Sequence, residues 1–161
     1  GSLTLLGMLW VAGTLAFAFP IATAPGFRVL VVALVATVVA TDVGAYFAGR
    51  SWGARPMAPV LSPHKTLEGL AGGVVLGIAV AVLIGHFFEP LDIRIGAALG
   101  LVVAVMAPLG DLAESMVKRS LGVKDMGSVL PGHGGVLDRV DAFLFVVPAV
   151  WVLYETLGLL R

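Results

Sequence analysis

The 161 residues are 59% hydrophobic and only 12% charged, whereas an ordinary soluble domain is roughly a quarter charged. The apolar residues come in long runs without strand-like alternation, so the composition argues against a soluble protein and predicts an integral membrane protein of α-helices. A formal net charge of zero argues against nucleic acid as a partner, and the absence of cysteine excludes disulfide and thiolate chemistry.

The first two predicted helices cover the first third of the chain. Residues 3–24 carry no charge, and their length is enough for one membrane crossing. A cleaved signal peptide is the alternative, but the stretch lacks a basic start and its apolar part is too long. Pro20, Pro25 and Gly26 mark a turn. The second helix is expected over about 27–46.

Three more apolar spans follow, separated by polar connections. A loop with three prolines over 49–63 precedes the third span, 69–88, and a short connection precedes the fourth, which begins near Ile95. A glycine-containing loop over 121–135 leads into the fifth, which starts near Asp138. We therefore predict one domain, residues 1–161, in which 1–26 form the first helix and its turn. Its class is all-α: a bundle of about five transmembrane helices with a polar cavity on the cytoplasmic side.

Basic residues in the connections predict the orientation of the bundle. Seven of the ten lie after the second and fourth spans: Arg50, Arg55, Lys65, Lys118, Arg119, Lys124 and Arg139. By the positive-inside rule these segments face the cytoplasm, and the C-terminus lies outside. The bias is not independent support if the same cations bind substrate. We expect a multi-pass protein of the cell inner or plasma membrane.

Charge is concentrated in residues 111–141, which hold five of the ten acidic residues. Two sets are spaced to share one helical face: Asp111, Glu114, Ser115 and Lys118 in one helix, and Asp138 and Asp141 in the next. Carboxylates within a membrane are costly and usually face a polar cavity, where they are functional candidates. Oxygen ligands without cysteine select a hard metal ion. The alternative is that these acids cap helices or pair with neighbouring cations.

Pro108 lies three residues before Asp111 and removes a hydrogen bond from its helix. The resulting kink would open a pocket at the acids, or offer a backbone oxygen to a monovalent cation. An ordinary kink in a membrane helix explains the proline equally well.

Four cations lie in the same segment: Lys118, Arg119, Lys124 and Arg139. Arginine suits bidentate contacts to phosphate and lysine acts as a mobile point charge. A basic patch attracted to anionic lipid is the alternative, but such a patch does not need Asp125 and other acids among its cations. The nearby turn Gly132–Gly135 resembles a phosphate-cradling turn around His133, although a glycine-rich turn alone is weak support.

An earlier segment, Ser62 to Gly69, precedes the third span. Lys65 and Thr66 are candidate contacts for a phosphate or a lipid headgroup. Thr66 is equally suited to cap the helix with Glu68 in its first turn, and both roles can hold together. Asp42 shares one face of the second helix with Tyr46 and Arg50, so it either joins the polar cavity or pairs with Arg50.

Together these segments resemble a known enzyme family, the phosphatidate cytidylyltransferases or CDP-diacylglycerol synthases. Its signature runs through Ser115, Lys118-Arg119, Lys124-Asp125, Gly127, Leu130-Pro131, His133-Gly134-Gly135, Asp138-Arg139 and Asp141, and this chain departs from it nowhere. The run Ser62-Pro63-His64-Lys65-Thr66 resembles a second segment of the same family. The resemblance covers roughly Asp42 to the C-terminus, and members usually carry further N-terminal helices.

The resemblance implies that CTP and phosphatidate react to give CDP-diacylglycerol and pyrophosphate. Asp111 and Asp138 would hold Mg²⁺, with Asp141 as a third ligand or an orienting group, and a second, monovalent cation such as K⁺ stays open. The four cations would hold phosphates, of which Lys118 and Arg139 count as catalytic. The remaining expected contacts to substrate are Asp42, Lys65, Thr66, Ser115, Asp125, His133, Gly134 and Gly135.

The implied partners are CTP, phosphatidate and the membrane lipid, and the family is often dimeric. Three other functions stay open at this point. A CTP-dependent polyprenol or lipid kinase would use the same metal and cations but would attack the γ-phosphorus. An ion-coupled transporter also places acids in the membrane, but no inverted repeat supports it. A non-catalytic membrane subunit would keep normal lipid synthesis when the acids are removed.

Overall fold

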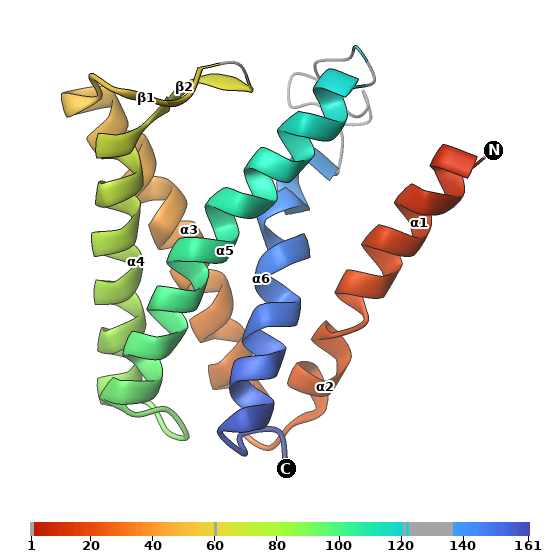
Figure 1. Ribbon diagram of the computed structural model, residues 1–161. Helices are drawn as coiled ribbons and strands as arrows, with labels where there is room; N and C mark the ends of the chain where they lie inside the picture. Colours follow the sequence, from red (N-terminus) through yellow and green to blue (C-terminus); the bar gives the residue numbers. More distant parts are fainter. Residues whose placement is uncertain (1, 60, 121, 123–136) are drawn as a thin grey trace.

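Long helices running between two polar ends make up most of the chain (Figure 1). The computed structural model describes all residues except 1, 60, 121 and 123–136, and it describes no side chains for 2–6, 63 and 137–140. In chain order the elements are α1 (Ser2–Leu15), α2 (Ala18–Thr23), α3 (Phe27–Trp52), β1 (Pro56–Ala58), β2 (Ser62–Thr66), α4 (Leu67–Phe87), α5 (Ile93–Ser120) and α6 (Leu137–Thr156).

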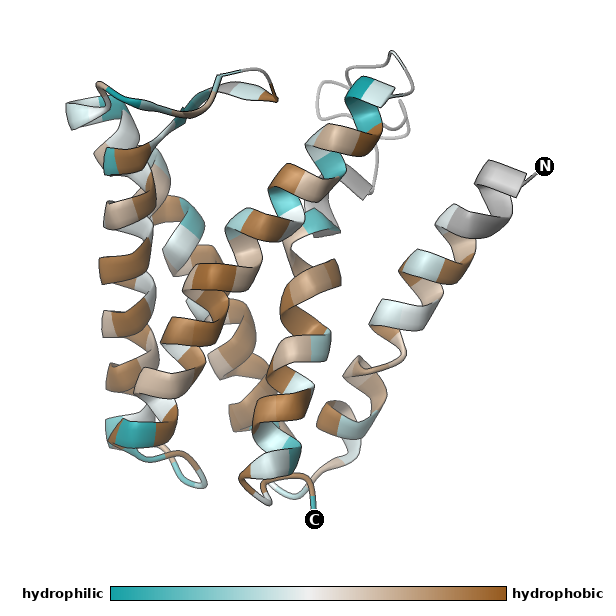
Figure 2. Cartoon of the chain, in the orientation of Figure 1, coloured by the Kyte–Doolittle hydropathy of each residue, from teal (hydrophilic) through white to brown (hydrophobic). Residues whose placement is uncertain are grey.

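Hydrophobic residues fill the middle of the helices, and hydrophilic residues gather at their ends (Figure 2). Within the described part of the chain, α3, α4 and α5 are each long and apolar enough to cross a membrane. A helical membrane protein is therefore confirmed, because only helices satisfy their backbone groups internally in lipid without closing into a barrel. The number of spans, predicted as five, stays a prediction.

The predicted first helix is divided in two. Residues 3–24 form α1 and α2, with a break at Ala16 and Phe17, where hydrogen bonds from i to i−3 replace the regular pattern. Pro20 explains the position of the break, because a proline ring clashes with the carbonyl four residues before it, here that of Ala16. The turn expected at Gly26 is confirmed, since its φ of 72° suits glycine.

The loop predicted over 49–63 is only partly correct, whereas the all-α class is confirmed, since helices make up most of the chain and its two strands are short. Helix α3 continues to Trp52, and the next residues form an antiparallel hairpin in which Pro56 pairs with Thr66 and Ala58 with Ser62. Its register is irregular between these two pairs. Prolines lack an N–H and so cannot extend a ladder, which is consistent with two short strands.

Glycines let α3 and α4 lie in close contact. A Cβ on Gly44 would stand 2.6 Å from the carbonyl oxygen of Gly72, and a Cβ on Gly72 would overlap the Cβ of Ala48. Small residues at such positions are typical of helix pairs in membranes, where backbones approach closely. This contact fixes the spacing between the two helices that carry one side of the polar end.

We expect Gly72→Ala to lower the free energy of unfolding by about 1–3 kcal/mol, because the added methyl group overpacks this contact. Denaturation of the purified chain in mixed detergent micelles, followed by circular dichroism, measures the change. Gly7→Ala in α1 is the matched control, since a Cβ there meets no atom within 4 Å. Equal stability of the two variants would contradict the close packing.

A second close contact joins α5 to α6 directly beside the predicted acids. A Cβ on Gly110 would lie 2.8 Å from the carbonyl oxygen of Asp141. Further along, Val146, Val150 and Tyr154 of α6 are buried in the core, and the Tyr154 hydroxyl donates a hydrogen bond to the carbonyl oxygen of Leu30. The packing therefore brings Asp111, the residue after Gly110, next to the first turns of α6.

The polar segments collect at one end of the bundle. The hairpin, the end of α5 and the beginnings of α1 and α6 lie at the top of Figure 1, whereas the C-terminus lies at the opposite end. Most of the basic segments thus share one side, as the positive-inside argument requires, with the C-terminus on the other.

Candidate functional site

A pocket of about 420 Å³ opens at the polar end, between α3, the hairpin, α4 and α5. Its lining combines charged and apolar side chains: Thr41, Asp42, Ala45, Tyr46, Gly49, Arg50, Met57, His64, Lys65, Thr66, Gly69, Leu70, Gly73, Ala107, Pro108 and Asp111. Of the predicted site residues, Asp42, Lys65, Thr66 and Asp111 line this pocket.

One ion pair crosses this pocket. The Lys65 ammonium on β2 lies 2.5 Å from a carboxylate oxygen of Asp111 on α5, and both side chains are about two-thirds to three-quarters buried. Asp42 on α3 lies within electrostatic range of both charges. Two predicted substrate-binding residues and one predicted metal ligand are thus brought together.

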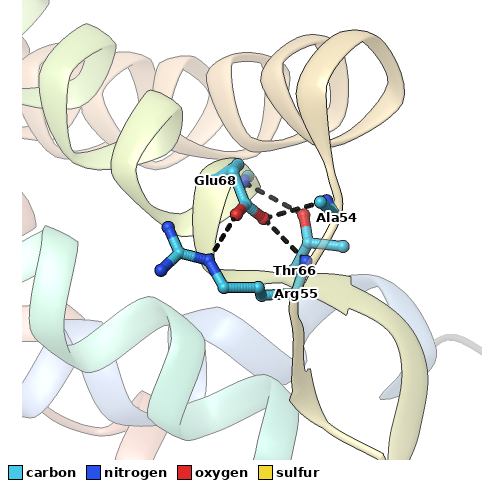
Figure 3. Close-up of polar contacts among 5 residues, drawn as sticks. Ala54, Arg55, Thr66 and Glu68 are labelled. Atoms are coloured by element: carbon cyan, nitrogen blue, oxygen red, sulfur yellow. Dashed lines mark hydrogen bonds and ion pairs between the residues drawn. The ribbon is translucent and has the colours of Figure 1, made fainter.

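The segment that carries Lys65 is held in place by its neighbours (Figure 3). The Thr66 hydroxyl accepts a hydrogen bond from the backbone N–H of Gly69 and so caps α4, as predicted. The Glu68 carboxylate accepts hydrogen bonds from the backbone N–H groups of Ala54 and Arg55 and from the Arg55 guanidinium. These contacts tie the end of α3 to the start of α4, and they set the position from which Lys65 reaches Asp111.

Asp42 joins the pocket, which decides between the two alternatives left open for it. Arg50 does not pair with Asp42 among the described contacts; its Nη1 donates a hydrogen bond of 3.1 Å to the hydroxyl oxygen of Tyr46. Tyr46 and Arg50 are both exposed and both line the pocket. Pro108 also lines it, one turn before Asp111, as expected of a proline that shapes the pocket.

A second charged cluster lies where α5 meets α6. Glu114 is only 2% exposed, and its Oε2 atom lies 2.6 Å from the Lys118 ammonium one turn further along α5. Its other oxygen, Oε1, is buried and has no hydrogen-bond partner among the residues that the structure describes. An ionised group this deeply buried is costly unless a positive charge stands close to it.

Asp141 connects this cluster with Asp111. It lies close enough to Asp111 and Glu114 for the charges of both to act on it, and its Oδ1 accepts a hydrogen bond from the N–H of Ala142. Asp111 therefore stands between two environments. The pocket with Lys65 lies on one side, and the acids Glu114 and Asp141 lie on the other.

The donor chemistry of this second side fits a hard cation. Carboxylate oxygens are the ligands that Mg²⁺ prefers, and Glu114 offers a buried oxygen without a donor. No group of three or more His, Asp or Glu side chains within the described residues is arranged to hold a metal ion. A complete site therefore needs a further ligand, and the side chain of Asp138 lies outside the described residues.

Seven predicted site residues lie outside the described residues, either wholly or in their side chains. They are Lys124, Asp125, His133, Gly134, Gly135, Asp138 and Arg139. The predicted approach of Asp111 to Asp138 thus stays a prediction. Ser115 is half-buried and Arg119 exposed on α5, next to the cluster of Glu114 and Lys118.

Three residues that the structure places at the site are outside the set of site residues predicted from the sequence. Spacing groups Glu114 with Asp111, Arg50 is expected at the cytoplasmic side or beside Asp42, and His64 is part of a family segment. The spacing of four between Glu114 and Lys118 was the available signal for their pair. No local signal marks His64 or Arg50 as pocket residues.

Comparison with known proteins places these features in a family. A family model described as "Cytidylyltransferase family" matches residues 1–157. Phosphatidate cytidylyltransferase of Mycobacterium bovis is 46% identical over 120 residues, 74% of this chain and 39% of that protein. The enzyme of the same name from Bacillus subtilis is 46% identical over 114 residues, 70% of this chain and 42% of that protein.

A solved structure shows the same arrangement of helices. It belongs to an intramembrane enzyme for archaeal membrane lipid biosynthesis, with a TM-score of 0.60 and 26% identity over 76% of this chain and 77% of that one. The chain spans about two-fifths of the length of the curated relatives it matches.

Proposed function

Since this chain belongs to the cytidylyltransferase family, we propose that it transfers the cytidylyl group of CTP to phosphatidate, giving CDP-diacylglycerol and pyrophosphate. The observation that carries the proposal is the place of Asp111. Asp111 lines the pocket at the polar end of the bundle, where it pairs with Lys65. It also lies close to Asp141, in the acidic cluster that contains Glu114 and Lys118. Such a place suits a residue that brings two anionic substrates together.

The chemistry needs no nucleophile from the protein. An oxygen of the phosphatidate phosphate attacks the α-phosphorus of CTP, the new P–O bond forms, and the bond to the β-phosphate breaks, so that pyrophosphate leaves. The protein's task is to position both phosphates and to offset negative charge that builds up during transfer. Lys65 and Lys118, each beside a carboxylate, are fixed cations on the two sides of Asp111.

A divalent metal ion, when bound, would supply positive charge that offsets the negative charge at the reacting phosphorus. Asp111 and Asp141 would hold Mg²⁺ together with Asp138, and Glu114 would stand beside them. Lys118, Arg119, Lys124 and Arg139 would contact the phosphates of CTP. A monovalent cation such as K⁺ remains a further proposal for the same acidic cluster.

The location of the reaction follows from the orientation of the bundle. Because most basic residues lie at the end that holds the pocket, we place this end and the active site on the cytoplasmic side of the membrane. The acyl chains of phosphatidate would stay in the bilayer while its headgroup enters the polar end. Assembly into a homodimer is proposed from the family resemblance alone.

The direct test follows a label from nucleotide to lipid. The purified chain in detergent micelles is incubated with phosphatidate and CTP labelled at the α-phosphate, with Mg²⁺ or with EDTA. We expect label in the lipid fraction and pyrophosphate in solution only when Mg²⁺ is present. Release of CDP would instead identify a kinase, and no transfer by a folded chain would overturn the proposal.

A further inference from the structure

The two sides of Asp111 differ in chemistry, and this difference bears on which substrate each side takes. Towards α6 lie buried acids and Lys118. Towards α3 and the hairpin lies the pocket, whose walls include Met57, Leu70 and Pro108 as well as charged groups. One side is strongly polar, whereas the other combines an apolar wall with a few charges.

Charges within the pocket are unevenly distributed. Lys65 is paired with Asp111, and Asp42 lies near both, so this end holds two carboxylates and one ammonium. Arg50 lies two helical turns beyond Asp42 on α3, about 12 Å along the helix axis. Arg50 forms no ion pair with an acid among the contacts of the described residues. The pocket is therefore net negative near Asp42 and positive near Arg50.

The arrangement of Arg50 suits a phosphate group. Among the contacts of the described residues, one of its N–H donors is used, by the hydroxyl oxygen of Tyr46 at 3.1 Å. The Tyr46 hydroxyl accepts that bond and keeps its own proton for another acceptor. A guanidinium fork beside a hydroxyl donor matches the geometry of a phosphate monoester.

The end of α3 that carries Arg50 presents aromatic side chains at its surface. Tyr46 is 58% exposed, Phe47 63% and Trp52 76%, all on the last turns of that helix. Aromatic side chains of this kind are typical of the boundary between lipid and water. A ligand held by Arg50 can therefore keep its apolar part in the bilayer.

We propose that Arg50, with Tyr46, binds the phosphate of the lipid substrate, and that the pocket determines which substrate binds on this side of Asp111. The inference rests on the proposed function, which supplies phosphatidate as the lipid. CTP is assigned to the side of Lys118, where the other cations and the proposed Mg²⁺ would hold its phosphates.

The first test measures the two substrates separately. We expect Arg50→Gln to raise the KM for phosphatidate about 10- to 100-fold, because a charge-assisted hydrogen bond is lost, while the KM for CTP changes less than about twofold. The KM of Arg50→Lys for phosphatidate should lie between those of the wild type and of Arg50→Gln. Arg28→Gln, the same change at the opposite, exposed end of α3, is the matched control and should alter neither constant.

The second test does not depend on turnover. Native mass spectrometry of the detergent-solubilised chain counts bound phosphatidate in wild type, in Arg50→Gln and in Arg28→Gln. We expect retention to fall about 10- to 100-fold in Arg50→Gln alone. Diacylglycerol, which lacks the phosphate, should bind all three proteins equally. Inorganic phosphate should displace little phosphatidate, since a lipid site also holds the acyl chains; full displacement would identify a free-phosphate site and overturn the proposal.

Outcomes of the two tests separate this inference from the function on which it rests. Retention that depends on Arg50 without any cytidylyl transfer would overturn the proposed function and leave the lipid site standing. Normal transfer with an unchanged KM for phosphatidate in Arg50→Gln would overturn the lipid site alone. If Arg50→Gln raised the KM for CTP and not the KM for phosphatidate, the pocket would be a site for the nucleotide.

Discussion

Asp111→Asn is expected to reduce cytidylyl transfer about 1000-fold. The change removes the negative charge that faces Lys65 in the pocket and Asp141 across the helix contact. It leaves the size of the side chain almost the same, so the fold should persist. Transfer of α-phosphate label from CTP to phosphatidate at saturating Mg²⁺ measures the loss.

The matched control is Asp92→Asn at the other end of α5. Asp92 accepts a hydrogen bond from the N–H of Ile95, and asparagine caps a helix equally well, so activity should stay within about twofold of wild type. If Asp111→Asn kept wild-type activity, Asp111 would be neither a metal ligand nor a charge that the reaction needs. The position of Asp111 between the pocket and the acidic cluster would then serve only the stability of the fold.

Lys118→Met is expected to lower the free energy of unfolding by about 3–5 kcal/mol and to abolish measurable transfer. The stability is lost because the Glu114 carboxylate, 2% exposed, is left without the ammonium 2.6 Å away. The activity is lost because a cation beside the acidic cluster is removed. Unfolding in mixed detergent micelles measures the first effect, and label transfer to lipid measures the second.

A double variant separates these two effects. Glu114→Gln combined with Lys118→Met removes both charges and should recover most of the lost stability, because the buried Glu114 carboxylate is no longer left without its cation. Transfer should stay low, since the cation is still absent. Recovery of both stability and activity in the double variant would show that Lys118 serves only to neutralise Glu114.

Much of the candidate site was readable from local patterns. The alignment of Asp111, Glu114 and Lys118 on one helical face needed only the periodicity of a helix, and the pair of Glu114 with Lys118 follows from it. The cap at Thr66 followed from a threonine placed before an apolar run. In each case the interacting residues are one turn apart, so the helix itself brings them together.

Other contacts were not readable, because they join residues that are distant along the chain. Lys65 and Asp111 were assigned separately to substrate and metal, and no pattern placed one beside the other across 46 positions. The sequence predicts a loop where the hairpin forms, because prolines are more typical of loops than of paired strands. The division of the first helix at Ala16, by contrast, is a local effect of Pro20 four residues later.

Composition and the spacing of apolar runs are enough to predict a helical membrane bundle whose charges gather in two short segments at one end. Long apolar runs have no other stable form in lipid, and the hydrophobic effect acts on each run independently of the rest. Which of those charges lie in contact depends on how the helices pack against one another. Glycines at 44, 72 and 110 let particular helix faces come into backbone contact, and only that packing sets Arg50, Lys65 and Asp111 around one pocket.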